Sequence, residues 1–163
     1  MSEQNPFANH SIKLRGESMD RKRLRMIRKG LRTLHTLEIM AVNIYRYQIT
    51  SKFPDLTAHL IAAMENEMRH VRDFIVKLLE YGMSPSPIRW AYWIVGFCFG
   101  FGSRILGKRM ILQTGIWVET KAVHHYQELL DTIEWDEDTR PIVERDQEDE
   151  RHHIALWESL LKK

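Results

Sequence analysis

A repeated pairing of glutamate with histidine limits what this chain can fold into. Glu67 and His70 stand three residues apart, and Glu150 and His153 repeat that spacing near the other end of the sequence. Residues three apart in an α-helix project from the same face, so the two side chains of each pair can reach one metal ion. Chance alone produces such pairs in a chain rich in glutamate and histidine. Whether these two pairs are metal ligands therefore depends on the spacing of further acidic residues.

One further glutamate precedes each pair by about the length of a helix. Glu38 lies 29 residues before Glu67, and Glu119 lies 31 residues before Glu150. Residues equidistant from the turn of an antiparallel helix pair lie side by side, so each leading glutamate is expected level with the pair that follows it. The two halves of the chain therefore repeat one pattern, which predicts an internal pseudo-twofold axis.

Four helical patterns carry these residues. Short breaks within residues 51–55 and 134–139 make the first two helices, and likewise the last two, antiparallel neighbours. The prediction is an all-α fold, a ferritin-like four-helix bundle with one long crossover. A chain of 163 residues suits one such domain, which we place at 19–163 after a flexible basic tail at 1–18. Apolar residues recur with the helical period over about 20–50, 54–81, 103–133 and 140–161.

The crossover between the second and third of these helices is rich in glycine and aromatic residues. Residues 90–103 carry no charge, and basic residues flank them on both sides. A stretch of this length is too short to cross a bilayer. Trp90, Tyr92 and Trp93 have side chains that prefer the headgroup boundary. A packed crossover helix is the simpler interpretation, whereas the composition favours an extra apolar, membrane-interfacial helix.

Composition excludes several other classes of protein. The single cysteine, Cys98, excludes an internal disulfide framework and a four-cysteine zinc or iron–sulfur site within one chain. A mean hydropathy of -0.39 excludes a polytopic membrane protein. The net charge of +2 hides a basic first fifth, for which nucleic acid, an anionic membrane surface and a plain solvated helix face are the alternatives. We expect no nucleic acid partner. The basic residues are Lys13, Arg15, Arg21, Lys22, Arg23, Arg25, Arg28, Lys29 and Arg32.

Four glutamates and two histidines form the predicted metal centre. Di-iron and di-manganese carboxylate bundles have this arrangement, in which two helices each supply one glutamate and the other two each supply a Glu-x-x-His motif. Carboxylate and imidazole ligands suit hard to borderline metals, and burying four carboxylates without cations would be prohibitively costly. The predicted ligands are Glu67 and Glu150 as bridges, Glu38 and Glu119 as terminal ligands, and the histidines His70 and His153.

Two alternatives to this ligand set stay open. The first is that the six residues are solvated charges on amphipathic helices, against which the apolar neighbours of Glu38 and Glu119 argue. The second concerns the last motif, because Asp149 and His152 also stand three apart. Glu150 with His153 matches the first motif better, so we favour that register.

Blocks beyond the ligands resemble the demethoxyubiquinone hydroxylase family, membrane-associated di-iron enzymes of ubiquinone biosynthesis. The resemblance covers roughly residues 30–160, and four blocks carry it. The chain departs from the family pattern around the ligands at Leu37, Ile39, Met40 and Thr120, so the quinone pocket could differ. The four blocks are residues 41–48, 66–74, 96–108 and 118–126, the last ending in His124-His125-Tyr126.

This resemblance implies a di-iron monooxygenase. Two iron ions, with manganese as the alternative, would activate dioxygen to hydroxylate the ring of a polyprenyl quinone. The enzyme would lie peripherally on the cytoplasmic side of the inner membrane, or on the mitochondrial inner membrane in a eukaryote. It could act as a homo-oligomer or in a biosynthetic complex, and its electron donor, a partner protein or reduced quinone, is not identified by the sequence.

Three further residues are candidates to touch substrate or to relay a proton or an electron. Tyr45 and Tyr126 follow Glu38 and Glu119 by seven residues each, and His125 precedes Tyr126. A packed ring, or a hydrogen bond to a ligand carboxylate, is the alternative role for these side chains.

Two other functions stay open. One is a ferritin-like protein that oxidises and stores iron or reduces peroxide. The lack of a four-cysteine module argues against a complete peroxide-reducing rubrerythrin, and the aromatic crossover argues against a ferritin cage. The other is a metal-free, membrane-associated helical adaptor, against which the intact set of six ligands argues.

Overall fold

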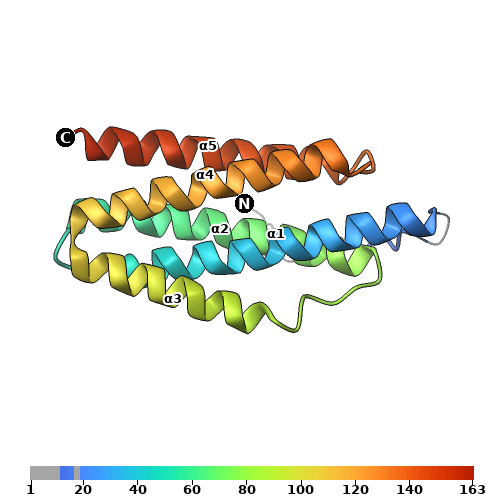
Figure 1. Cartoon of the computed structure of the whole chain (residues 1–163), viewed down its shortest axis with the longest axis horizontal. Coiled ribbons are helices and arrows are strands. Elements are labelled where there is room, and N and C mark those ends of the chain that lie inside the picture. Colours follow the sequence, from blue (N-terminus) through green and yellow to red (C-terminus); the bar gives the residue numbers. More distant parts are fainter. Residues whose placement is uncertain (1–11, 17–18) are drawn as a thin grey trace, which may run out of the picture.

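The structure, a computed structural model, describes residues 12–16 and 19–163, and every regular element in these residues is an α-helix (Figure 1). The predicted helices are confirmed, with one shifted boundary. The third bundle helix begins at Lys108 rather than near Ser103, because Gly107 has a φ of 98° and separates two helices there. The helices are α1 (Arg21–Gln48), α2 (Pro54–Glu80), α3 (Arg89–Leu106), α4 (Lys108–Thr132) and α5 (Arg140–Leu161).

Local sequence accounts for where the bundle helices begin. The carboxylate of Asp20 accepts hydrogen bonds from the backbone N–H groups of Lys22 and Arg23, at 2.9 and 3.0 Å, and so caps α1. Proline stands in the first turn of α2 and of α5, where its missing N–H costs nothing. These starts help to set the level at which the predicted ligand residues of α1, α2 and α5 lie.

Helices α1, α2, α4 and α5 form the four-helix bundle. α1 packs against α2 and α4 packs against α5, while contacts of α1 with α4 and of α2 with α5 join the two pairs. The core has two apolar clusters, one containing Ile27, Leu31 and Phe74, the other containing Leu60 and Trp157. On each bundle helix the predicted ligands lie in sequence between the residues of the two clusters. The metal centre is therefore expected midway along the bundle.

Helix α3 lies outside the bundle against α1 (Figure 1). A Cβ atom on Gly96 would lie 2.5 Å from the carbonyl oxygen of Met40, and one on Gly100 would overlap that of Ile44. The two backbones therefore touch, and only glycine fits at these positions. The Nε2 group of Gln48 also donates to Ser103 Oγ at 2.9 Å. The simpler expectation of a packed crossover helix is confirmed, and its placement at a membrane stays a prediction.

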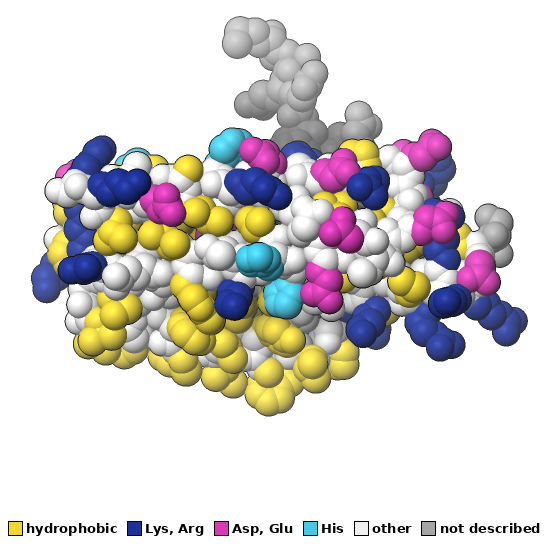
Figure 2. Space-filling model, turned by 45° about the horizontal axis from the view of Figure 1, so that its top comes forward, with side chains coloured by type: hydrophobic (Ala, Val, Ile, Leu, Met, Phe, Trp, Pro, Cys, Tyr) yellow, Lys and Arg dark blue, Asp and Glu magenta, His cyan; other side chains and the backbone are white. Residues whose placement is uncertain are grey.

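The outward side of α3 is apolar. Together with the neighbouring start of α4 it exposes a continuous group of large side chains, which we call the α3 apolar face and which is visible as the yellow area at the bottom of Figure 2. In the residues that the structure describes, no helix is both long enough and apolar enough to cross a membrane. The face consists of Trp90, Trp93, Ile94, Val95, Phe99, Phe101, Ile105, Leu106, Met110 and Trp117.

Of the predicted tail, only residues 12–16 are described. Arg15 forms an ion pair with Glu80 at 2.9 Å and another with Asp136 at 3.5 Å. Residues 1–11 and 17–18 lie outside the described residues. The prediction of a flexible tail is therefore left open.

Replacing Gly100 by alanine is expected to destabilise the protein, because the added methyl group would overlap the Ile44 carbonyl oxygen. Overpacking of this kind costs about 1 to 3 kcal/mol. Gly102→Ala is the matched control, since its added carbon would meet no described atom within 4 Å other than those of its chain neighbours and of the backbone of its own helix. Alanine in a helix is about 0.5 to 1 kcal/mol more stable than glycine. Urea unfolding measures both, and equal free energies of unfolding would contradict close packing of α3 on α1.

Candidate metal centre

The six predicted ligands converge from four helices into the middle of the bundle. All are buried, the four glutamates with at most 2 % of their surface exposed. Their ligand atoms fall into two overlapping groups, in each of which the atoms lie within 4.8 Å of one another. The groups are Glu38, Glu67, His70 and Glu150, and Glu67, Glu119, Glu150 and His153. This burial argues against the alternative of solvated surface charges.

Glu67 and Glu150 lie at the centre of both groups. His70 Nδ1 is 3.4 Å from Glu67 Oε2 and 3.3 Å from Glu150 Oε1. His153 Nδ1 is 3.1 Å from Glu67 Oε1 and 3.3 Å from Glu150 Oε2. Each of these glutamates thus directs one oxygen toward each histidine, which is the geometry expected of bridging carboxylates.

The other two glutamates each approach one histidine, and each is held by a tyrosine from the other half of the chain. Glu38 Oε2 lies 3.8 Å from His70 Nδ1, and Glu119 Oε1 lies 3.8 Å from His153 Nδ1. The hydroxyl of Tyr126 donates to Glu38 Oε1 at 2.5 Å, and that of Tyr45 donates to Glu119 Oε1. The repeated tyrosines therefore orient the outer carboxylates across the pseudo-twofold axis.

The protonation of this cluster follows from its burial. Burial raises the pKa of Glu38 and of Glu119 well above the ordinary value, and the charges of neighbouring glutamates contribute in both cases. Burial also acts to raise the pKa of Glu67, but the close contacts with His153 and His70 outweigh it and lower that pKa. For His153 burial acts downward, and the contacts with Glu150 and Glu67 prevail and raise its pKa to about 10. The carboxylate and imidazole groups of the cluster thus shift one another's pKa in opposite directions.

The remaining polar atoms of the cluster fit metal ions. Both carboxylate oxygens of Glu67, Glu150 Oε1, Glu119 Oε2 and His70 Nδ1 have no hydrogen-bond partner among the described residues, although all are buried. Buried polar atoms are nearly always paired, so these atoms require cations or protons. The oxygen and imidazole donors suit iron or manganese rather than thiolate-seeking metals. The arrangement can hold two ions that share Glu67 and Glu150, and the assignment of the ligands stays a prediction.

Sequence reasoning missed Asp146 and named Asp149 only in the alternative register of the last motif; both lie behind His70. Its Nε2 atom is 3.3 Å from Asp149 Oδ2 and 3.7 Å from Asp146 Oδ1. Asp146 is fully buried, and burial raises its pKa to about 6. A carboxylate behind a metal-binding histidine fixes the tautomer and orientation of the ring. Asp146 precedes Glu150 by four residues and His153 by seven, so the helical period of α5 could have indicated it.

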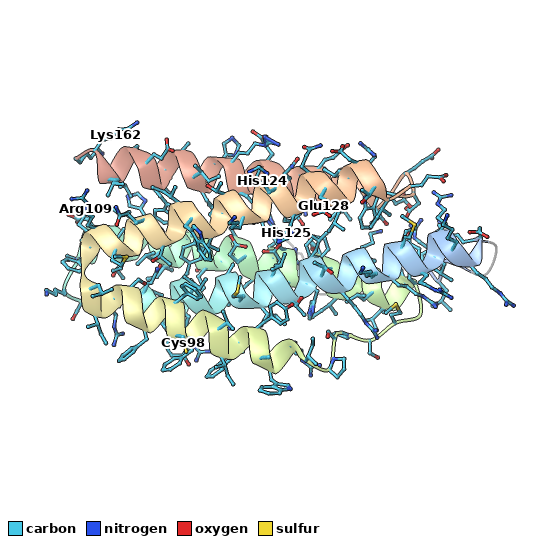
Figure 3. The ribbon with its side chains drawn as sticks, in the orientation of Figure 1. Cys98, Arg109, His124, His125, Glu128 and Lys162 are labelled. Atoms are coloured by element: carbon cyan, nitrogen blue, oxygen red, sulfur yellow. The ribbon has the colours of Figure 1, made fainter. Side chains whose placement is uncertain are left out.

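The structure distinguishes the two registers of the last motif. His153 is buried within the cluster, whereas the side chain of His152 is 71 % exposed and lies near Glu148. His125 is also solvent-exposed on α4, near Glu128 (Figure 3). Unlike the two tyrosines, it forms no hydrogen bond or ion pair with a predicted ligand among the described residues.

A cavity of about 260 Å³ leads to the outer glutamates between α1 and α4. Its lining is mostly apolar, with Glu38 and Glu119 at the metal centre and Lys121 and His125 as its other polar residues. The apolar lining consists of Leu37, Met40, Ala41, Trp117, Val118 and Ala122. The ring of Trp117 stacks on Phe99 of α3, with ring centroids 5.4 Å apart. One wall of the cavity therefore borders the α3 apolar face.

Fold and site together define a class: a four-helix bundle whose buried glutamates and histidines form clusters that could hold metal ions. Comparison with known proteins then identifies the family. Residues 25–163 match the family described as ubiquinone biosynthesis protein COQ7, and the chain belongs to it.

Several curated relatives are similar over most of this chain. A 3-demethoxyubiquinol 3-hydroxylase of Pseudomonas fluorescens (strain SBW25) is 27 % identical over 125 residues, which are 76 % of this chain and 58 % of that protein. The enzyme of the same name from Polaromonas sp. (strain JS666) is 30 % identical over 76 % of this chain and 60 % of its own length. The Homo sapiens NADPH-dependent 3-demethoxyubiquinone 3-hydroxylase, mitochondrial, is 26 % identical over 86 % of this chain and 69 % of its own length. The chain thus spans about three fifths of the bacterial relatives.

Glu119→Gln is expected to keep or raise the stability of the metal-free protein while reducing the stabilisation that ferrous iron gives. Glutamine has the same shape, still accepts the Tyr45 hydrogen bond, and removes a carboxyl group whose ionisation burial opposes. A gain of about 1 kcal/mol would raise the melting temperature by about 2 to 4 °C in a protein of this size. Thermal unfolding with chelator and with ferrous iron measures both effects. A large loss of stability in chelator would contradict this account of the buried charge.

Proposed function

We propose that this chain is a di-iron, oxygen-dependent monooxygenase that hydroxylates the benzoquinone ring of a polyprenylated precursor in ubiquinone biosynthesis. The observation that carries the proposal is the apolar cavity that runs from the outer glutamates to the edge of the α3 apolar face. In a member of this family, such a cavity offers a quinone ring a route to buried carboxylate and imidazole ligands.

In this proposal Glu38, Glu67, Glu119 and Glu150 hold two iron ions together with the two buried histidines, and manganese is the alternative occupant. When bound, the iron pair would supply the activation of dioxygen. One oxygen atom is inserted into a ring C–H bond and the other leaves as water, with two electrons and two protons from an external reductant. The human and bovine relatives are named as NADPH-dependent, and for this chain a reduced nicotinamide and a reduced quinone are the two candidate donors.

The residues around the cavity then have distinct roles. Tyr45 and Tyr126 hold the outer carboxylates in place through their hydroxyl groups. Leu37 and Met40 narrow the cavity and exclude water from the ring. His125 lies at the cavity with its side chain half exposed, so it is the candidate to donate a hydrogen bond to a ring oxygen and to exchange its proton with solvent.

The same proposal assigns the bundle to the ferritin-like class and places α3 at a membrane interface. The buried residues of α3 are the small Gly96, Gly100 and Ser103, while its large side chains point outward. A helix of this kind fits an apolar medium better than water. The protein would act peripherally at the cytoplasmic face of the inner membrane or, in a eukaryote, at the mitochondrial inner membrane, as a homo-oligomer or within a biosynthetic complex.

The two other functions have less support. An iron-storing or peroxide-reducing protein needs access for small ions or peroxide, whereas this cavity is lined mainly by apolar side chains. A metal-free adaptor would not require four buried carboxylates, three of which have an oxygen without a hydrogen-bond partner among the described residues. Family membership likewise favours the hydroxylase.

Purified without chelator, the protein is expected to bind two ferrous ions per chain and, with a reductant and oxygen, to hydroxylate a demethoxyubiquinone. Glu67→Ala and His153→Ala remove a bridging and a terminal ligand, so each should abolish this stoichiometry and reduce turnover at least about 100-fold. His152→Ala is the matched control and should behave as the wild type, because His152 faces solvent. Anaerobic titration and product analysis test these outcomes. Two ions per chain without any hydroxylated product would favour the storage or peroxide function.

Leu37→Trp should block the cavity without emptying the metal centre. Leu37 lines the cavity, so a larger side chain there should lower kcat/KM for the quinone about tenfold or more while two ferrous ions still bind. Ile39→Trp is the matched control, because Ile39 lies on another side of α1 and lines a different hollow. Unchanged kinetics in Leu37→Trp would remove the cavity as the substrate site.

A further inference from the structure

A groove with a positively charged lining runs along the first half of α1. It has a volume of about 950 Å³ and lies between α1, the connection from α2 to α3, and the start of α3. Its cations recur at the helical spacing, so successive turns of α1 present one toward the groove. They are Arg21, Arg25, Arg28, Lys29 and Arg32. The dark blue side chains at the lower right of Figure 2 show this basic end of the molecule beside the apolar area.

No carboxylate compensates these charges within ion-pair distance among the residues that the structure describes. Arg28 donates to the carbonyl oxygen of Tyr81 at 3.1 and 2.7 Å, and Arg32 donates to that of Ser84 at 3.4 Å. Carbonyl oxygens carry no net charge, so these bonds orient the guanidinium groups and leave their positive charge in place. The groove is therefore suited to an anion.

The rest of the groove combines four apolar or aromatic side chains with the hydroxyl groups of Thr33, Thr36 and Ser86, and it reaches the start of α3. Leu24, Met83, Ile88 and Tyr92 line it, and the last two lie at the start of α3. Ile88 is 56 % exposed and Trp90, the first large residue of the face, is 63 % exposed. An occupant of this groove meets guanidinium groups on one side and exposed apolar side chains on the other. A small hydrophilic anion would use only half of that surface.

We propose that this groove binds the phosphate headgroup of an anionic phospholipid whose acyl chains lie along the start of α3. The proposal rests on the interfacial placement of α3 made above. A guanidinium group donates two parallel hydrogen bonds to phosphate, and cations beside an anionic membrane surface each add to the attraction. Headgroup binding at this end of α3 would turn the α3 apolar face, and the cavity beside Trp117, toward the lipid.

Vesicle flotation tests the groove with the full-length protein. The wild type should bind vesicles of phosphatidylcholine with one-fifth phosphatidylglycerol about tenfold or more tightly than vesicles of phosphatidylcholine alone. The double variant Arg25→Glu/Lys29→Glu should bind both kinds of vesicle about equally, because it reverses two charges that line the groove. Neither side chain makes a hydrogen bond to a described residue, so the fold should be unaffected. The circular dichroism of this variant, its iron content and its turnover of a short-tail soluble quinone should match the wild type.

Lys162→Glu/Lys163→Glu is the matched control. It changes the net charge equally at the end of α5, which lies at the opposite end of the bundle from the start of α1 (Figures 1 and 3), and it should keep the preference for anionic vesicles. If both double variants lose the preference for anionic vesicles equally, the preference reflects general charge attraction and the proposal is overturned. A wild type that shows no preference for anionic vesicles would also overturn the proposal. The same holds if inorganic phosphate raises the melting temperature of the wild type and this effect depends on Arg25 and Lys29. If the wild type binds neither kind of vesicle, the interfacial placement of α3 fails as well, whereas equal binding to both overturns the groove alone.

Discussion

The burial of four carboxylates inside one helical bundle is the constraint on which the rest of this structure depends. Ionised carboxylates are strongly disfavoured in an apolar interior, so the bundle has to offset their cost on both sides of the site. It does so with two apolar clusters, one toward each end, that contain large buried side chains such as Phe74 and Trp157. Tyr45 and Tyr126 add hydrogen bonds to the two outer carboxylates. The length of the helices follows, because the chain must build core on either side of a polar centre.

The pseudo-twofold symmetry of the ligands is not shared by their surroundings. His70 has Asp146 and Asp149 behind it, whereas the ring of His153 lies beside Tyr45 and Trp157, with centroids 6.3 and 6.5 Å away. Carboxylates behind a histidine increase its basicity, and aromatic rings exclude water without doing so. An ion beside His70 would therefore meet a more electron-rich ligand than an ion beside His153. The repeated sequence thus encodes two positions with equal predicted ligands and unequal environments.

Sequence predicted the parts of this structure that depend on spacing along one helix. The 3.6-residue period located the bundle helices, and the i, i+3 spacing of Glu67 with His70 placed both side chains on one face. The partners of each tyrosine could not be predicted, since Tyr45 reaches Glu119 only through the packing of α1 on α4. The role of Asp149 was missed for a similar reason, because it faces a histidine from another helix. The assumed start of α4 was wrong because the period alone does not show the break that Gly107 makes.

Helix α3 reverses the ordinary arrangement of an amphipathic helix. A surface helix of a globular protein usually turns its large apolar side chains inward and its polar ones outward. Here the buried residues of α3 are glycine and serine, whereas most of its large aromatic and aliphatic side chains are exposed, although Phe99 also stacks on Trp117 of α4. Their exposure contributes nothing to the core, and contiguous apolar patches of this kind mark surfaces that contact another molecule or a membrane. Close packing through Gly96 and Gly100 therefore does more than attach α3, because it keeps the apolar face beside the cavity. In the proposed function, one surface would then both contact lipid and admit a lipid-tailed ring.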